Sequence, residues 1–236
     1  MASRFQFALP DPRPRDGWFR VGNLDITTTA LLVFAGVASM FLYAVNKVWF
    51  EKLAFNSVSV RDGDAWRLAT WPIANPPTRI WVVLTLVFFW FVGHMIEELV
   101  GRIRYAVMIA VVVIVPAAIV TALPAATFLT GALGLSLLLT TMFAVFAAEN
   151  PHAPSFFGIP VWILAAVIIG IDVLRILGDR LWGALVMMLS MIVLAFVMMR
   201  QWGFVARLSF IPNLGSAKKP HPPRRGPAPP RTAARR

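Results

Sequence analysis

Residues 130–146 read TGALGLSLLLTTMFAVF, a run without a single charged side chain. Ser136 is one of its few polar residues, and two glycines, Gly131 and Gly134, precede it. A run of about 20 apolar residues is long enough to cross the roughly 30 Å hydrocarbon core of a bilayer. The stretch therefore predicts a membrane-spanning helix, and it raises the question of whether its serine is reactive.

The composition of the whole chain points the same way. Of the 236 residues, 58% are hydrophobic and 14% are charged, whereas a soluble domain carries about 25% charge. The apolar residues come in long blocks rather than in an amphipathic stripe, which predicts an all-α polytopic membrane protein. Because the chain has no cysteine, disulfides and cysteine-ligated metals are excluded.

The order of the apolar blocks predicts three regions. Residues 1–27 form a polar cytoplasmic segment, residues 28–200 a six-helix membrane domain, and residues 201–236 a basic, proline-rich tail with little to bury. The expected spans are residues 28–49, 79–99, 103–123, 125–147, 158–177 and 181–200. The first span is too long for the apolar part of a signal peptide, so we expect it to stay in the protein.

The distribution of Lys and Arg predicts the orientation. Six spans place both ends of the chain on one side of the membrane, and the cytoplasmic side is enriched in Lys and Arg. Fifteen of the 22 Lys and Arg lie in the N-terminal segment, in the turn at 100–104 and from Arg200 onward. Both termini are therefore predicted to be cytoplasmic. The bias toward Ala, Val and Arg favours a bacterial protein in the plasma membrane.

Three motifs interrupt the apolar blocks. They are Trp66-Arg67-Leu68-Ala69-Thr70 after the first span, Gly93-x3-Glu97-x3-Gly101 at the end of the second, and Gly131-x-x-Gly134 at the start of the fourth. Each has a structural interpretation, because Trp and Arg anchor chains at membrane interfaces and small residues let helices approach. Glu97 lies near a helix C-terminus, where the dipole disfavours an anion, so we expect Arg102 or Arg104 beside it.

In this order, the motifs resemble the rhomboid family of intramembrane serine proteases over roughly residues 55–200. Rhomboids carry the Trp-Arg motif in the first loop, the Gly-x3-Glu-x3-Gly pattern in the second helix, and Gly-x-Ser-Gly, with its nucleophilic serine, in the fourth. The stretch FFGIPVWIL at residues 156–164 looks like the start of their fifth helix. The resemblance implies a six-helix fold and partners that are transmembrane helices, which rhomboids recognise at an opening between helices two and five.

The residues that the family uses for catalysis are missing from this chain. Aligning Gly-x-Ser-Gly with residues 131–134 puts Leu133 at the nucleophile position, while Ser136 lies deeper and is expected to bond the carbonyl of Ala132. A serine nucleophile needs an adjacent base, and the histidine of the sixth rhomboid helix has no counterpart in residues 181–200. The start of the second span also lacks the His and Asn of an oxyanion hole. The resemblance therefore implies a pseudoprotease without a cofactor.

Two other polar groups could support chemistry. His94, Glu97 and Glu98 share one helix turn, but two carboxylates and one imidazole make only a partial metal site, so we predict no bound metal. Asp172 lies inside the fifth span, and Arg175 follows three residues later. We expect these two side chains to pair.

The favoured hypothesis is a non-catalytic membrane protein that binds transmembrane helices of partner proteins, as an adaptor, chaperone or assembly subunit. The expected helix-binding face consists of aromatic residues of the second span, although such a face can also simply meet lipid: Trp81, Phe88, Trp90 and Phe91. The alternatives are an active rhomboid protease and a small transporter or channel subunit. The scarcity of polar residues in the spans argues against transport.

The basic tail predicts a second contact. Lys218, Lys219, Arg224 and Arg225 are expected to attract anionic lipid head groups on the cytoplasmic side. Anchoring of the topology is the simpler interpretation of the same charges. Nothing in the tail is of a type that reads nucleic-acid bases, so no specific nucleic-acid partner is predicted.

Overall fold

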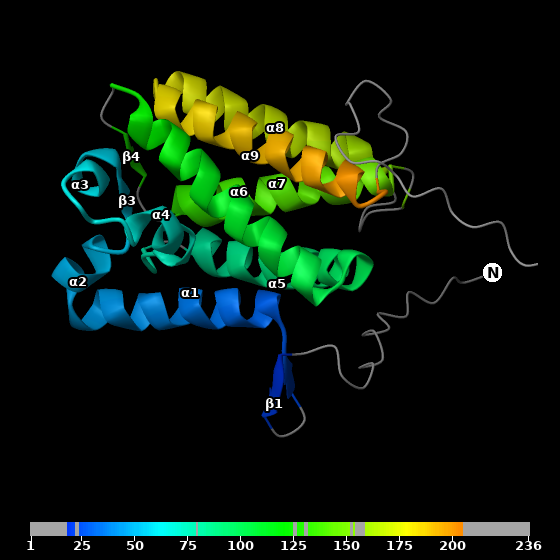
Figure 1. Ribbon diagram of the computed structural model, residues 1–236, viewed down its shortest axis with the longest axis horizontal. Helices are drawn as coiled ribbons and strands as arrows, with labels where there is room; N and C mark the ends of the chain where they lie inside the picture. Colours follow the sequence, from blue (N-terminus) through cyan, green and yellow to red (C-terminus); the bar gives the residue numbers. More distant parts are fainter. Residues whose placement is uncertain are drawn as a thin grey trace, which may run out of the picture.

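The structure, a computed structural model, describes residues 18–21, 24–78, 80–124, 127–129, 132–151, 153 and 159–204. Within these residues six long helices run alternately in opposite directions through one bundle (Figure 1). They are α1 (Thr28–Val45), α5 (Ile80–Val100), α6 (Arg102–Ala122), α7 (Ala132–Glu149), α8 (Val161–Gly178) and α9 (Trp182–Gln201). The basic tail with Lys218, Lys219, Arg224 and Arg225, together with Gly131, lies outside the described residues.

Short elements occupy the connections. The chain between α1 and α5 contains α2 (Lys47–Glu51), β3 (Phe55–Asn56), α3 (Ser57–Arg61), α4 (Arg67–Thr70) and the 3-10 helix η1 (Trp71–Ile73). Ahead of α1, β1 (Phe19–Val21) pairs antiparallel with β2 (Leu24–Ile26). Strand β3 pairs antiparallel with β4 (Phe128–Leu129), and this pairing joins the first loop to the segment before α7.

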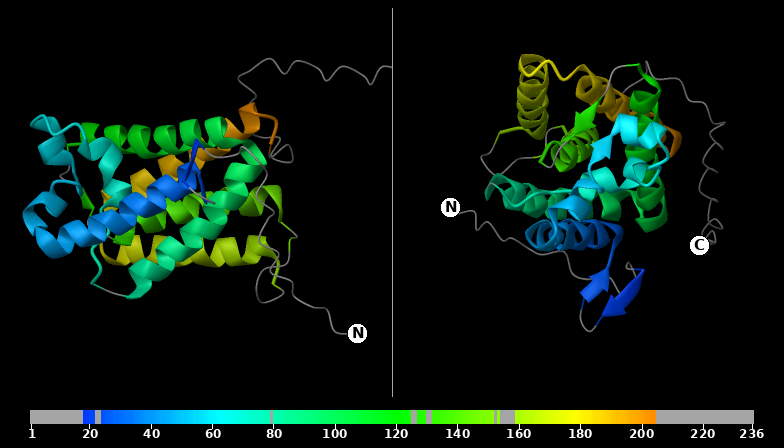
Figure 2. Two further views of the ribbon diagram at one scale, coloured as in Figure 1. Left: turned by 90° about the horizontal axis from the view of Figure 1, so that it is seen from below. Right: turned by 90° about the vertical axis from the view of Figure 1, so that its left-hand side faces the viewer.

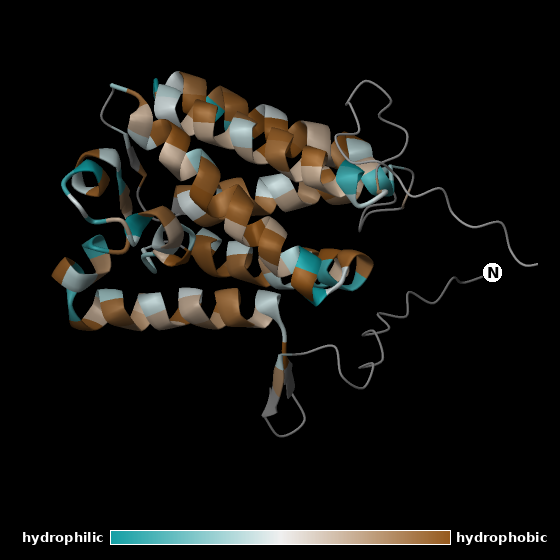
Figure 3. Ribbon diagram, in the orientation of Figure 1, coloured by the Kyte–Doolittle hydropathy of each residue, from teal (hydrophilic) through white to brown (hydrophobic). Residues whose placement is uncertain are grey.

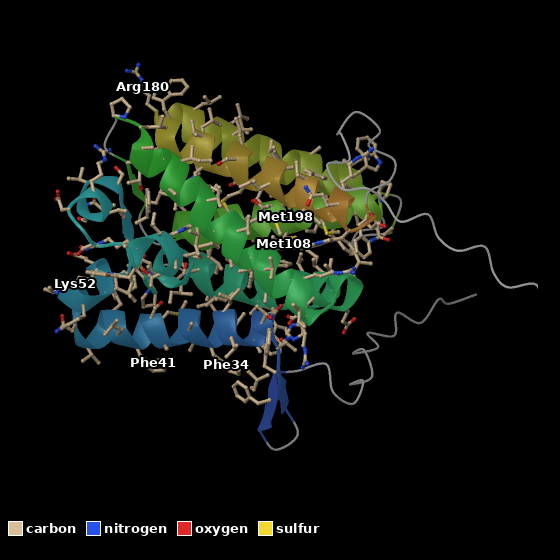
Figure 4. The ribbon with its side chains drawn as sticks, in the orientation of Figure 1. Phe34, Phe41, Lys52, Met108, Arg180 and Met198 are labelled. Atoms are coloured by element: carbon tan, nitrogen blue, oxygen red, sulfur yellow. The ribbon has the colours of Figure 1, made fainter. Side chains whose placement is uncertain are left out.

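The helices have the length and surface of membrane spans. Among the described residues, α1, α5, α6, α8 and α9 are long and apolar enough to cross a membrane, whereas the apolar part of α7, Leu133–Glu149, is shorter. Figure 3 shows apolar residues along the helices and polar residues gathered at the two ends of the bundle. Phe34 and Phe41 point away from the bundle on α1 (Figure 4), and Phe41 is 70% exposed. The chain is therefore an integral membrane protein built from helices, as predicted.

Helix α7 is the centre of the bundle. It packs against α5, α8 and α9, and the end-on view in Figure 2 shows these helices arranged around it. Leu137, Leu138 and Met142 of α7 are fully buried. Beside it, α6 packs along α9, and Figure 4 shows Met108 and Met198 close together between these two helices.

Two helix boundaries differ from the prediction. The first span, predicted as residues 28–49, ends at Val45, because the side chain of Asn46 caps the separate helix α2 by accepting a hydrogen bond from the Trp49 N–H (3.2 Å). The helix predicted as the fourth span, from residue 125, begins at Ala132. Ser57 and Thr127 exchange hydrogen bonds of 2.8 and 3.0 Å, and together with the β3–β4 pairing these bonds keep the segment before α7 extended.

Candidate functional site

Arg67 of the Trp-Arg motif is a buried cation in the first loop. Its Nη1 donates hydrogen bonds to the carbonyl oxygens of Glu51 (2.8 Å) and Ala54 (2.9 Å). Its Nε donates to Oδ2 of Asp64 at 2.9 Å. The guanidinium therefore joins the end of α2, the following turn and the start of α4 through one side chain, a role that suits its planar array of donors.

The rest of the motif binds the same short segment. The indole N–H of Trp66 donates to the carbonyl of Lys52 at 3.1 Å, and the hydroxyl of Thr70 donates to the carbonyl of Leu53 at 2.9 Å. With the two bonds from the guanidinium, each carbonyl of residues 51–54 receives a side-chain donor. Carbonyls at a helix end otherwise lack partners. The motif thus holds together the loop between α1 and α5.

Glu97 of the second motif binds the start of α1. Its carboxylate accepts hydrogen bonds from the N–H groups of Thr28 (2.8 Å) and Thr29 (2.9 Å) and from the Thr29 hydroxyl (2.7 Å). The hydroxyl of Thr27 accepts the next bond, from the N–H of Ala30 at 3.1 Å. The first N–H groups of α1 are therefore satisfied by side chains, and an anion is favourable at a helix N-terminus.

This arrangement changes the expected partner of Glu97. We predicted a cation from Arg102 or Arg104, but the groups bonded to the carboxylate belong to the positive end of α1. The guanidinium of Arg102 lies over the ring of Trp18, with 5.4 Å between its central carbon and the ring centroid.

The two glycines of this motif allow the helices to close around Glu97. A Cβ at Gly93 would lie 2.7 Å from Cγ2 of Thr29 and 3.0 Å from the hydroxyl of Tyr105, so both α1 and α6 approach α5 closely here. Gly101 has φ +90°, a conformation that glycine adopts without strain. It turns the chain from the end of α5 directly into α6.

The third motif lies at the start of α7, against the first loop. Leu133, which holds the nucleophile position of the family pattern, is half-buried against the hydrophobic core. A Cβ at Gly134 would lie 2.9 Å from both the carbonyl oxygen and Cε3 of Trp71. Gly134 therefore permits close packing of α7 on η1. Ser136 is half-buried farther along the helix, and its bond to the carbonyl of Ala132 stays a prediction.

His94 is the one histidine among the described residues, and it lies in the second half of α5, whereas Ser136 lies in the second turn of α7. Its Nδ1 donates to the carbonyl of Trp90 at 2.8 Å, and Nε2 lies 3.1 Å from the hydroxyl of Thr27. Within the described residues no three His, Asp or Glu side chains are grouped so that they could hold a metal ion. The carboxylate of Glu97, which shares a turn with His94, is bonded to α1.

Helix α7 exposes one stripe of its surface. Between Leu133 and Phe146 its half-buried side chains recur every three or four positions, which places them on one helix face. We call this set the α7 stripe: Leu133, Ser136, Leu139, Phe143 and Phe146. The two phenylalanines lie next to Val161 and Ala165 of α8. Helices α5 and α8 both pack on α7 but not extensively on each other (Figure 2).

The aromatic residues predicted as a helix-binding face on α5 do not all lie together. Trp81, Phe88 and Phe91 are between 41% and 62% exposed. Trp90 instead faces α1, where its ring makes an edge contact with Phe34 at 6.4 Å between centroids. Three of the four predicted residues therefore remain available to a partner or to lipid.

Asp172 joins α8 to the central helix. The hydroxyl of Thr140 on α7 donates a hydrogen bond to Oδ2 of Asp172. We expected Arg175 to pair with Asp172 and did not identify Thr140, which is 32 residues away. The only sequence signal for Thr140 was that it is one of the few polar residues in its span.

No family model matches this chain, and neither the curated proteins nor the solved structures that were compared with it give a match. Function is therefore inferred from the contacts of its own residues.

The packing of Gly134 gives a direct test of how α7 sits on η1. We expect Gly134→Ala to lower the free energy of unfolding by about 1–3 kcal/mol, because the added methyl would meet a backbone carbonyl that cannot move aside. Gly170→Ala on α8 is the matched control, since a Cβ there has nothing within 4 Å. Unfolding in mixed detergent–SDS micelles measures both. Equal stability of the two variants would contradict this packing.

Proposed function

We propose that this chain is a rhomboid-like pseudoprotease, a non-catalytic membrane protein that binds transmembrane helices of partner proteins along the α7 stripe. The observation that carries the proposal is the stripe itself. A mostly apolar face of the central helix is half-exposed, and the helices α5 and α8 that pack on this helix make few contacts with each other. In a bilayer, helices associate by packing and by satisfying polar groups, and this face offers both.

The arrangement of the helices supports kinship with the rhomboid fold. Six long helices alternate in direction, and the fourth of them, α7, is central. The start of α1 and the end of α9 lie at the same end of the bundle (Figure 1), as six crossings with both termini in the cytoplasm require. The positions of the three motifs support the proposal: Arg67 begins α4 in the first loop, Glu97 lies near the end of α5, and Gly134 lies in the first turn of α7.

The chemistry of the same region supports a role without catalysis. The nucleophile position holds Leu133, whose side chain has no group to attack a peptide bond. Helix α9, Trp182–Gln201, contains no histidine. Ser136 therefore has no base from the helix that supplies one in rhomboids, and His94 is bonded near the start of α1.

The location and the role of the tail follow from the same proposal. The protein resides in a bacterial plasma membrane, and Lys218, Lys219, Arg224 and Arg225 contact anionic head groups on the cytoplasmic side. Binding of client helices makes the chain an adaptor, a chaperone or a subunit of a membrane assembly.

Cross-linking from single cysteines tests helix binding, because the natural chain has no cysteine. The test variant Leu139→Cys places the cysteine in the α7 stripe. The control variant Ile119→Cys places it on α6, where the Ile119 side chain is 41% exposed. Each variant, labelled with a photoactivatable maleimide, is irradiated in native membranes. We expect discrete adducts with membrane proteins from position 139 only. Identical adduct patterns from both positions would contradict binding at the stripe.

A cleavage assay tests whether the protein is catalytically inactive. The purified protein, incubated in liposomes with a fluorogenic transmembrane substrate, is expected to cleave it no faster than the Ser136→Ala variant does. Cleavage that Ser136→Ala abolishes would show an active protease and would remove the pseudoprotease proposal.

A further inference from the structure

Asp172 is an acidic side chain in the middle of a membrane helix. It lies on the side of α8 that faces α7, because Ala165 and Ile176, seven residues before and four residues after it, are buried there. It is nevertheless half-buried rather than enclosed. Since Asp172 is six residues before the end of α8 at Gly178, it lies about 9 Å below the outer end of that helix.

The known hydrogen bond satisfies only part of this carboxylate. Thr140 donates to Oδ2, whereas an ionised carboxylate can accept about four hydrogen bonds through its two oxygens. Among the exposed neighbours of Asp172 on α8, Ile171 (60% exposed) and Leu174 (71% exposed) are apolar, and Arg175, one helical turn away, is a cation that interacts with the carboxylate electrostatically and makes no ion pair with it within 4 Å. Acidic groups inside membranes are costly, and they occur where they pair with another polar group or serve a function.

The surroundings of Asp172 indicate where its partner comes from. Thr140 follows Ser136 by one helical turn on α7, so the Thr140–Asp172 pair borders the α7 stripe. Within the α7 stripe, Ser136 is the one polar residue and the other four side chains are apolar. A helix lying along the stripe would therefore meet one anionic group, at one depth, in an otherwise apolar contact.

We propose that Asp172, positioned by Thr140, recognises a lysine or arginine side chain on the partner helix. This inference rests on the proposed function, because it assumes that a helix binds along the α7 stripe. It adds the chemical identity of the partner: an apolar transmembrane segment with one basic residue about 9 Å from its outer end. Opposite charges paired inside the membrane remove the cost that each would carry alone.

A designed peptide is the probe. It is a leucine–alanine transmembrane helix of about 22 residues with a single lysine about six residues from its outer end, and the reference peptide has leucine at that position. Both carry an acceptor dye at the outer end, and the protein carries a donor dye at Lys52→Cys on the exposed first loop. Energy transfer in liposomes then gives the dissociation constants. We expect the lysine peptide to bind about five- to thirtyfold more tightly than the leucine peptide.

Variants of the protein assign the preference to Asp172. Asp172→Asn retains an oxygen that can accept from Thr140, so the helix pair stays intact, and the preference for lysine should disappear. Thr140→Val should weaken the preference for the lysine peptide, because the Thr140 hydroxyl orients the carboxylate of Asp172. Thr140→Ser keeps the hydroxyl and should keep the preference. Arg175→Gln removes the cation one helical turn from Asp172 and should retain or strengthen the preference, because that cation competes with the lysine for the carboxylate. A loss with Arg175→Gln equal to that with Asp172→Asn would show that the preference does not arise from the charge of Asp172 and would overturn the inference.

The outcomes separate this inference from the proposed function. Equal, measurable binding of both peptides, or a lysine preference that survives Asp172→Asn, overturns the role of Asp172 and leaves helix binding standing. Failure of both peptides to bind overturns the inference. If, in addition, Leu139→Cys forms no specific adducts in native membranes, the proposed function fails as well.

Discussion

Replacing Glu97 with leucine is expected to lower the free energy of unfolding by about 3–5 kcal/mol. The carboxylate, only 5% exposed, accepts from two backbone N–H groups and one hydroxyl of Thr28 and Thr29. Leucine would leave these three donors in an apolar interior without acceptors, and it would remove the anion that stabilises the start of α1. The midpoint of unfolding in mixed detergent–SDS micelles measures the loss.

Two further variants establish that the loss comes from the contact with α1. Glu98→Leu removes an adjacent carboxylate that is exposed, and its effect should stay within about 0.5 kcal/mol. Glu97→Gln keeps one acceptor oxygen without the charge, so its loss in the free energy of unfolding should lie between those of Glu97→Leu and Glu98→Leu. Hydrogen exchange at residues 28–31 should accelerate in Glu97→Leu and remain slow in Glu98→Leu. A destabilised Glu97→Leu protein with unchanged exchange at these residues would contradict a capping role.

The helices were the most predictable part of this molecule. Crossing a bilayer requires about 20 apolar residues in succession. The local sequence therefore determines where a span lies, and the helices that pack against the span have little influence on it. The predicted second, third, fifth and sixth spans agree with α5, α6, α8 and α9 to within three residues. The errors occurred where tertiary contacts decide: Asn46 ends α1 by capping α2, and β4 delays the start of α7 by pairing with β3.

The partners of the polar residues could not be predicted. Glu97, the Thr140–Asp172 pair and the Ser57–Thr127 pair form contacts across 68, 32 and 70 residues of chain, respectively. Patterns within one helix suggest partners three or four residues away, and such reasoning proposed Arg175 for Asp172. In a membrane bundle the nearest polar group often belongs to another helix, and sequence spacing holds no information about which one.

The sequence predicted which residues of the candidate site matter, but it did not predict which groups they contact. The three motifs identified Arg67, Glu97 and Gly134, and each turns out to make a specific tertiary contact. The α7 stripe was not predicted, because most residues of this central helix are apolar and only the packing of the neighbouring helices decides which of them stay half-exposed. For the same reason Trp90 was grouped with Trp81, although it packs on α1.

The second large effect is expected from Arg67→Ala, which should lower the free energy of unfolding by about 3–4 kcal/mol. The substitution removes the donors to the carbonyls of Glu51 and Ala54 and leaves the carboxylate of Asp64 without its cation. The side chain of Arg67 is 10% exposed, so water cannot fully replace these bonds. Unfolding in mixed micelles gives the magnitude, and proteolysis of residues 50–66 reports whether the loop has loosened.

Arg67→Lys separates charge from geometry in this loop. A lysine retains the positive charge near Asp64 but presents a single ammonium group, which cannot reach both carbonyls and the carboxylate in the way that the planar guanidinium does. We therefore expect it to recover less than half of the loss. Trp66→Phe, which removes one N–H bond from a side chain that is 48% exposed, should cost about 1 kcal/mol or less. If Arg67→Lys had the same stability as the natural protein, the role of Arg67 would be limited to balancing the charge of Asp64. The hydrogen bonds to the carbonyls of residues 51–54 would then not be needed to order the loop.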